Sequence, residues 1–414
     1  MTTYLQQRTL FGPQILNRPS LNLGIIVVIP CYDEDYLLLS LLCLQKCDLP
    51  NCDVEVIVVV NGRLTDSPEV KIRNQQTYLQ ILDWSEKQRA TRLKFHVLYH
   101  PDLSVKHGGV GLARKIGMDE ACWRFEKVGN ADGIIACFDA DSRCQSNYLT
   151  ALEAHFSKHP NSPACSIRFE HPLQGPHFEP EVYESIVLYE LHLRYYIDAQ
   201  RYAGFPFAFQ TIGSSMAVRY KAYQQQGGMN RRKAGEDFYF LQKFIEWGHF
   251  TELKTTRVIP SPRPSHRVPF GTGKAVGNLL KKREYETYAP QSFMDIKSFF
   301  DQLPQWYTLK NGEELIGELP PSVGAFLKEM NFGKKWQELH QHTSSMDTFV
   351  SRFYRWFNAF TLMKYLHYSR DHYYRDVPVL EAANWLLDTS GHPTFANERE
   401  ALKYYRKWDY EMDT

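Results

Sequence analysis

The chain has 414 residues, of which 43% are hydrophobic and 23% charged, a balance typical of globular proteins and unlike that of disordered chains. Its net charge of only +1 argues against a protein that binds nucleic acid through a strongly basic surface. No apolar run approaches the roughly 20 residues of a membrane-spanning helix, and the N-terminus lacks a signal-peptide pattern. We therefore expect a soluble cytoplasmic protein, with peripheral contact at the inner membrane face left open as an alternative.

All eight cysteines lie in the first 165 residues, and none belongs to a C-x-x-C pair. Cys43, Cys47 and Cys52 are close in sequence, but no second cluster of cysteine or histidine completes a zinc pattern. Cys31 and Cys137 lie inside apolar runs, where free cysteine acts as a small core residue. Cysteine usage thus favours a reducing compartment.

The first 140 residues alternate between β-branched runs and helical patterns. Such alternation predicts a doubly wound, mostly parallel sheet, the Rossmann-like form of an α/β fold. Ligands of these sheets bind beyond the carboxyl ends of the strands. The expected strands are 24–30, 54–60, 93–99 and 133–138, and the expected helices are 36–44, 68–89 and 110–125.

The pattern changes beyond residue 180. We expect a helix at 181–202, a strand at 211–219, a helix at 236–247 and a loop rich in proline and glycine at 258–273. From 275 to the end the pattern is helical, with an aromatic segment at 349–374 that we interpret as helix core. The predicted organisation is an N-terminal extension at 1–22, a catalytic domain at 23–274 and a helical region at 275–414.

Two carboxylates follow the predicted strand 133–138. Asp139 and Asp141, at i and i+2, can reach the same hard cation, and Mg²⁺ or Mn²⁺ often bridges such carboxylates to substrate phosphates. A metal there would stabilise a diphosphate leaving group. A turn or helix cap is the structural alternative, because Asp33-Glu34-Asp35 repeats the same spacing elsewhere.

Further charged residues come from later segments. Glu236 and Asp237 open a predicted helix. A carboxylate there can act as a general base, or it can be present only because the helix dipole stabilises negative charge in the first turn. Arg263 and Arg267 in the loop 258–273 suit bidentate bonds to phosphate, or pairing with acids on the surface. His266, between them, is a candidate third metal ligand.

Five motifs in order resemble glycosyltransferase family 2, a large group with the GT-A fold, over about residues 23–270. Ile29-Pro30-Cys31-Tyr32-Asp33-Glu34 is similar to the family's opening I-P-x-Y-N-E, and the run from Val58 to Gly62 stands where the family has V-D-D-G-S. The remaining motifs are Gly111-Leu112-Ala113-Arg114 with Gly117, Phe138-Asp139-Ala140-Asp141-Ser142, and the pattern from Gly213 to Arg219 followed by Gly235-Glu236-Asp237.

The resemblance implies an inverting, metal-dependent hexosyltransferase that takes a nucleoside diphosphate sugar as donor. It implies Mg²⁺ or Mn²⁺ on Asp139, Asp141 and His266, and Asp237 with Glu236 as the catalytic carboxylates. The acceptor would be a carbohydrate or a lipid-linked molecule, as in polysaccharide biosynthesis. The donor nucleotide would lie against Pro30, Tyr32, Asp33, Glu34, Asn61, Arg114, Asp139, Arg263 and Arg267. Asp33 and Asn61 depart from the family residues, which leaves the identity of the base open.

Two alternatives stay open. The first is a non-catalytic protein with this fold that binds a nucleotide sugar or serves as a scaffold. The second is a sugar nucleotidyltransferase, which is disfavoured because residues 30–35 carry no lysine or arginine to meet a triphosphate.

Overall fold

The structure is a computed structural model that describes residues 2–88, 91–308, 316–341 and 343–411. The chain divides into two compact units. The first unit runs to Pro172 and resumes over Thr211–Lys274, and the second consists of Leu173–Gln210 and the chain from Ala275 onward. Residues 173–210 thus lie in the same compact unit as the helical C-terminal region, and residues 1–22 lie in the first unit.

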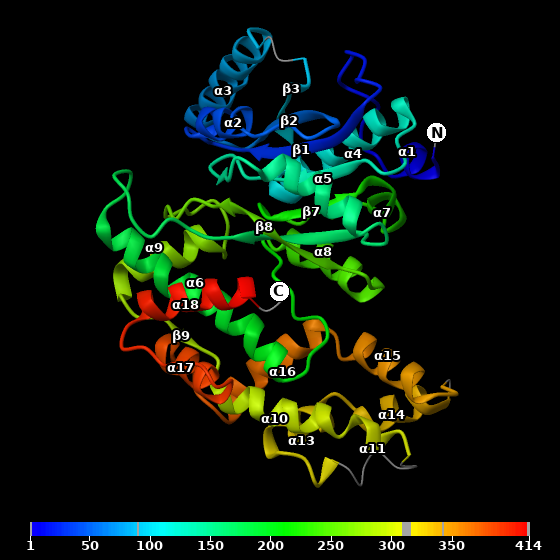
Figure 1. Ribbon diagram of the computed structural model, residues 1–414, viewed down its shortest axis with the longest axis vertical. Coiled ribbons are helices and arrows are strands. Elements are labelled where there is room, and N and C mark those ends of the chain that lie inside the picture. The colour runs from blue at the N-terminus through cyan, green and yellow to red at the C-terminus, as the bar shows by residue number, and fades with distance from the viewer. Residues whose placement is uncertain (1, 89–90, 309–315, 342, 412–414) are drawn as a thin grey trace. The chain divides into compact units, whose positions relative to one another are not determined.

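An eight-stranded sheet forms the centre of the first unit, in the order β3-β2-β1-β4-β7-β6-β8-β5 (Figure 1). The four strands β3, β2, β1 and β4 are parallel. β7 runs antiparallel to its neighbours β4 and β6, and β6 is parallel to β8, which pairs antiparallel with β5. The strands are β1 (Leu23–Cys31), β2 (Asp53–Arg63), β3 (Leu93–Leu103), β4 (Ile134–Cys137), β5 (Arg143–Cys144), β6 (Ala164–Phe169), β7 (Met216–Arg219) and β8 (Thr251–Ile259).

Helices cover both faces of this sheet. Alternate side chains of β1 point to opposite faces, and the side chains on both faces are buried. Ile25 and Val27 share a core cluster with Leu41 of α2 and with residues of α3 and α5. On the other face α4 lies so close that a Cβ at Gly117 would be 2.5 Å from a methyl carbon of Val28. The helices are α1 (Thr3–Gln7), α2 (Leu37–Gln45), α3 (Pro68–Glu86), α4 (Val110–Val128), α5 (Tyr148–Lys158), α7 (Tyr220–Gln225) and α8 (Glu236–Trp247).

The predicted α/β fold class, with a Rossmann-like sheet and a helical C-terminal region, is confirmed. The prediction missed α5 and β6, and the expected strand 211–219 is shorter, since only Met216–Arg219 pairs with neighbouring strands. The order β7-β6-β8-β5 also makes the second half of the sheet mixed, which the alternation of the first 140 residues did not indicate.

The N-terminal extension is a structural part of the first unit because it covers the polar side of α4. The hydroxyl of Tyr4 donates to Asp119 at 2.7 Å, and the backbone amides of Gln14 and Ile15 donate to the carboxylate of Glu120. Both acidic side chains are buried. The segment thus supplies hydrogen bonds to two buried carboxylates, whose burial would otherwise be more costly; Asp119 is also bonded by Tyr223 and Lys115.

The second unit is helical, with one short antiparallel pair of strands. The aromatic segment is helix core, as predicted, because Phe349, Phe353 and Phe357 are fully buried. Among the described residues we find no helix with the length and apolar character needed to cross a bilayer. Its elements are α6 (Pro180–Tyr202), α9 (Thr272–Lys282, whose first three residues belong to the first unit), α10 (Pro290–Asp301), α11 (Leu303–Trp306), α13 (Pro321–Glu329), α14 (Phe332–Gln341), α15 (Met346–Trp356), α16 (Ala359–His372), α17 (Val379–Thr389), α18 (Glu398–Glu411), β9 (Glu286–Thr287) and β10 (Val377–Pro378).

Candidate active site

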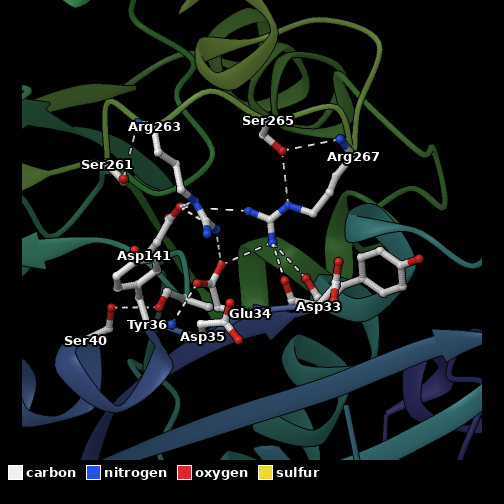
Figure 2. A network of polar contacts seen from close by, with 12 residues as sticks. Asp33, Glu34, Asp35, Tyr36, Ser40, Asp141, Ser261, Arg263, Ser265 and Arg267 are labelled. Carbon is white, nitrogen blue, oxygen red and sulfur yellow. Dashed lines mark hydrogen bonds and ion pairs between the residues drawn. The ribbon is translucent and has the colours of Figure 1, made fainter. Parts of the chain in front are cut away.

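Three loops of the first unit meet at the carboxyl edge of the parallel strands (Figure 2). One follows β1 and carries Glu34, one follows β4 and carries Asp141, and one follows β8 and carries Arg263 and Arg267. Parallel strands end at the same edge of a sheet, so loops after β1 and β4 are neighbours in space although about 100 residues separate them. The edge thus collects two carboxylates and two guanidinium groups.

Glu34 is the buried anchor of this cluster. Its carboxylate forms an ion pair with Arg263, accepts a hydrogen bond from Nη1 of Arg267 at 3.1 Å, and accepts the backbone amide of Tyr36 at 2.9 Å. Nη1 of Arg267 also donates to the backbone oxygen of Tyr32 at 2.8 Å. In this structure Glu34 therefore holds the two arginines in place, and its expected contact with the nucleotide stays a prediction.

Asp141 faces the same arginines. Its Oδ2 lies 3.1 Å from Nε of Arg263 and 4.0 Å from Nη2 of Arg267. Burial raises the pKa of Asp141 to about 6; the charge of Arg263 opposes this shift, and the negative charges of Asp139 and Glu34 add to it. The pKa of Asp141 is therefore raised mainly because the carboxylate is buried, and the two arginines offset only part of that effect.

A second cluster centres on Arg114, in the first turns of α4. Its Nη2 donates to Oδ1 of Asp139 at 2.5 Å, and its Nη1 pairs with the carboxylate of Glu236. Arg114 is buried, so it needs both carboxylates as partners. Residue 213 must be small here, because a Cβ on Gly213 would lie 2.6 Å from the guanidinium nitrogens of Arg114.

Glu236 and Asp237 open α8, and they differ in accessibility. Glu236 is buried and committed to Arg114, whereas Asp237 is only partly buried and its Oδ1 accepts the backbone amide of Phe238 at 2.8 Å. Burial raises the pKa of Glu236 to about 7 and also raises that of Asp237, while the charge of Arg114 opposes both shifts. Of the two, Asp237 is the carboxylate that a second substrate can reach.

The residues expected near the nucleotide base lie at the ends of β1 and β2. Pro30 is buried within β1, beside Val59 of β2. Asn61 is buried, and its Oδ1 accepts no hydrogen bond from the residues that the structure describes. Asp33 has a positive φ of 52° and lies 3.3 Å from Nε of Arg73. The hydroxyl of Tyr32 donates to Asp66 at 2.9 Å.

Asn74 of α3 was not predicted, yet it links these strand ends. Its Nδ2 donates to the backbone oxygen of Asn61 at 3.0 Å, and its Oδ1 accepts the amide of Asp33 at 2.9 Å. Ser40 of α2 has a similar role, because its hydroxyl donates to the backbone oxygen of Ala140 at 2.9 Å. The sequence shows only an asparagine inside a polar helical pattern. Neither its burial nor its hydrogen-bond partners could be predicted from that pattern.

The residues fit a divalent cation in charge and in ligand type. Five carboxylates meet three guanidinium groups across the two clusters, a surplus of two negative charges. Mg²⁺ is often held by only one or two protein carboxylates together with substrate phosphates, which matches Asp139 and Asp141. His266 is exposed, and the described residues contain no group of three or more acidic, histidine or cysteine side chains arranged for a metal. The expected trio with His266 is therefore not assembled.

Comparisons with known proteins give only distant similarity. No family model and no curated protein matches the chain, so its resemblance to glycosyltransferase family 2 stays a prediction. Among solved structures, residues 1–349 of S. aureus TarS in complex with UDP-GlcNAc share 16% sequence identity, with 81% of this chain and 93% of that chain covered and a TM-score of 0.42. The same TarS fragment in complex with UDP shares 15% identity, with coverage of 81% and 92% and a TM-score of 0.39.

Proposed function

We propose that the chain is a glycosyltransferase that takes a nucleoside diphosphate sugar as donor. The observation that carries this proposal is the meeting of Arg263, Arg267, Asp141 and the Arg114 cluster at the carboxyl edge of the parallel strands. A diphosphate needs cationic donors, and a sugar acceptor needs a carboxylate base within reach. Both kinds of group stand at this edge.

The donor side of the site consists of the two arginines and their anchors. Arg263 and Arg267 are held by Glu34 and Asp141, with their side chains partly exposed. A diphosphate supplies the same kind of oxygen acceptors as these carboxylates, so the partly exposed guanidinium groups can bind it while Glu34 continues to hold them. Asn61 and the loop 32–35 would receive the base, since the Oδ1 of Asn61 is a buried acceptor with no donor among the described residues.

Asp139 and Asp141 would hold Mg²⁺ or Mn²⁺ together with the donor. When bound, such an ion stabilises the negative charge that develops on the leaving diphosphate. The protein itself contributes the pairing of Arg114 with Asp139, which fixes one of the two carboxylates. The excess of carboxylates over arginines gives the ion a favourable electrostatic environment.

On the acceptor side, Asp237 would act as the general base. It accepts the proton of the acceptor hydroxyl while that oxygen attacks the anomeric carbon from the face opposite the leaving diphosphate, which inverts the configuration. Glu236 holds Arg114 instead of contacting the acceptor. The raised pKa of the two carboxylates suits a base that works near neutral pH.

The experiment that tests this proposal is a calorimetric titration with UDP, GDP, CDP and TDP, each with and without Mn²⁺. We expect one nucleotide to bind in a metal-dependent manner, and Asp141→Ala to remove that binding. Asp132→Ala, at an exposed carboxylate, is the control and should bind like wild type. Absence of binding by every nucleotide would contradict the proposal, and binding without turnover across acceptor panels would favour the non-catalytic alternative. Release of pyrophosphate from a nucleoside triphosphate would instead support a nucleotidyltransferase.

A further inference from the structure

Three cysteine sulfurs lie together beside the loop that carries Asp141. Cys43 near the end of α2 and Cys47, two residues past that end, both lie beside Cys144 of β5. The Sγ atom of Cys144 is 3.8 Å from that of Cys43 and 3.6 Å from that of Cys47. The sequence grouped Cys43 and Cys47 with Cys52, but the fold puts Cys144 in that place.

Cys43 has the surroundings of a reactive thiolate. Its sulfur accepts the backbone amide of Cys144 at 3.3 Å and lies within reach of the thiol of Cys144. The hydrogen bond from the Cys144 thiol lowers the pKa of Cys43 to about 6; burial opposes this shift, and the charges of Arg143 and Lys46 add to it. Cys43 is also only partly buried, so a small reagent can reach it.

The other cysteines lack this combination of exposure and stabilisation. Cys52 is equally partly buried, but burial and a hydrogen bond with Glu153 raise its pKa to about 12. Cys47 and Cys144 are buried beneath Cys43. The remaining four, Cys31, Cys122, Cys137 and Cys165, are almost fully buried in the core.

We propose that Cys43 and Cys144 form a redox modification site in which Cys43 reacts first and Cys144 resolves the product. The co-reactant is a low-molecular-weight disulfide such as oxidised glutathione. The Cys43 thiolate attacks one of its sulfurs, forms a mixed disulfide and releases one glutathione thiolate. The sulfur of Cys144 loses its proton to solvent and attacks Cys43, forming the protein disulfide and releasing the second glutathione. Two protein thiols are oxidised and one glutathione disulfide is reduced to two thiols.

Closure requires a modest movement. The two sulfur atoms must approach from 3.8 Å to about 2.05 Å, the length of a disulfide bond. Cys144 lies in a two-residue strand, the shortest of the sheet, and Cys43 near the end of α2, so small shifts of either segment can supply this distance. The bond would tie α2 to the segment three residues after Asp141. This inference does not depend on the proposed function.

The first test is the rate of alkylation by iodoacetamide at pH 7, measured at each cysteine by peptide mass spectrometry on the folded protein. A thiol with a pKa near 6 is about 90% ionised at this pH, against about 3% for an ordinary cysteine. We expect Cys43 to react at least about tenfold faster than Cys52, the matched cysteine of similar exposure. Equal rates, or faster reaction at Cys52, would overturn the proposal.

The second test follows the products of oxidised glutathione. Wild type and the control Cys52→Ser should yield a peptide pair linked through Cys43 and Cys144, reversed by dithiothreitol. Cys144→Ser should stop with glutathione attached to Cys43, and Cys43→Ser should take up none. Circular dichroism establishes that the variants are folded. A bridge from Cys43 to Cys47, or modification that begins at Cys144, would refute the assigned order.

Discussion

Replacing Glu55 by glutamine tests how the scaffold holds the site. Glu55 of β2 and Arg124 of α4 form a fully buried ion pair, and Nη2 of Arg124 donates to Oε1 at 2.6 Å. Burial alone would raise the pKa of Glu55, but the neighbouring His96 ring, whose Nε2 lies 3.8 Å from Oε1, and the hydrogen bonds from Arg124 outweigh it and lower the pKa to about 2. This pair joins β2, which carries Asn61 near its end, to α4, which carries Arg114 in its first turns.

Two estimates of how much Glu55→Gln lowers the free energy of unfolding agree. A shift from 4.5 to about 2 corresponds to about 3 kcal/mol of stability, present above about pH 4.5 and lost as the pH falls through 2. Breaking a buried ion pair on one side costs about 3–5 kcal/mol, because the remaining charge stays buried. We therefore expect Glu55→Gln to lower the free energy of unfolding of the first unit by about 3–4 kcal/mol at pH 7.

The measurement is urea unfolding, with hydrogen exchange on peptides of β2 and α4 so that the loss is assigned to the first unit. The variant should also lose most of the stability change between pH 4.5 and 2. Glu69→Gln, at an exposed glutamate in the first turn of α3, is the control and should change stability by under about 0.5 kcal/mol. A loss below about 1 kcal/mol for Glu55→Gln would refute the reasoning.

Three further predictions concern the site itself. Asp237→Asn should lower the rate of sugar transfer by at least about a hundredfold while donor affinity, measured by calorimetry, stays within about threefold; equal loss of both would remove Asp237 from the base role. The pH profile of kcat/KM should fall on acidification at a pH above the ordinary range of an aspartate, because burial raises the pKa of the base Asp237; a fall confined to below about pH 4 would contradict this. Arg263→Gln should weaken nucleoside diphosphate binding by about 10- to 100-fold, the loss of a charge-assisted bond of about 1.5–3 kcal/mol, whereas Arg92→Gln, at a more exposed arginine paired with Asp53, should leave it unchanged.

The sequence predicted the strongly patterned elements well. The helix expected at 236–247 has those bounds in the structure, and the β-branched runs became β1 and β2. β1 and β2 are easy to predict because a strand that is buried on both faces needs a continuous apolar run. α5 and β6 were missed, since a short amphipathic helix and a six-residue strand give weak periodic signals.

The residues of the site could also be identified in the sequence, but the contacts that each of them makes could not. Asp139, Asp141 and Asp237 were singled out from their positions after a strand and at a helix start. The sequence could not distinguish Glu34 as an anchor of two arginines from Glu34 as a ligand contact, because its partners lie more than 220 residues away. His266 was a candidate metal ligand in the sequence, and the structure shows that its side chain is exposed.

By itself, then, the sequence determined the α/β class and the acidic and basic side chains that follow the ends of the strands. These follow from local patterns of burial and charge. Only the tertiary structure decided that Glu236 is committed to Arg114 while Asp237 stays accessible, that Asn74 joins two strand ends, and that Cys144 replaces Cys52 in the thiol cluster. Each of these depends on which distant segments meet, and contacts between distant segments are set by the packing of the whole unit, which no local pattern encodes.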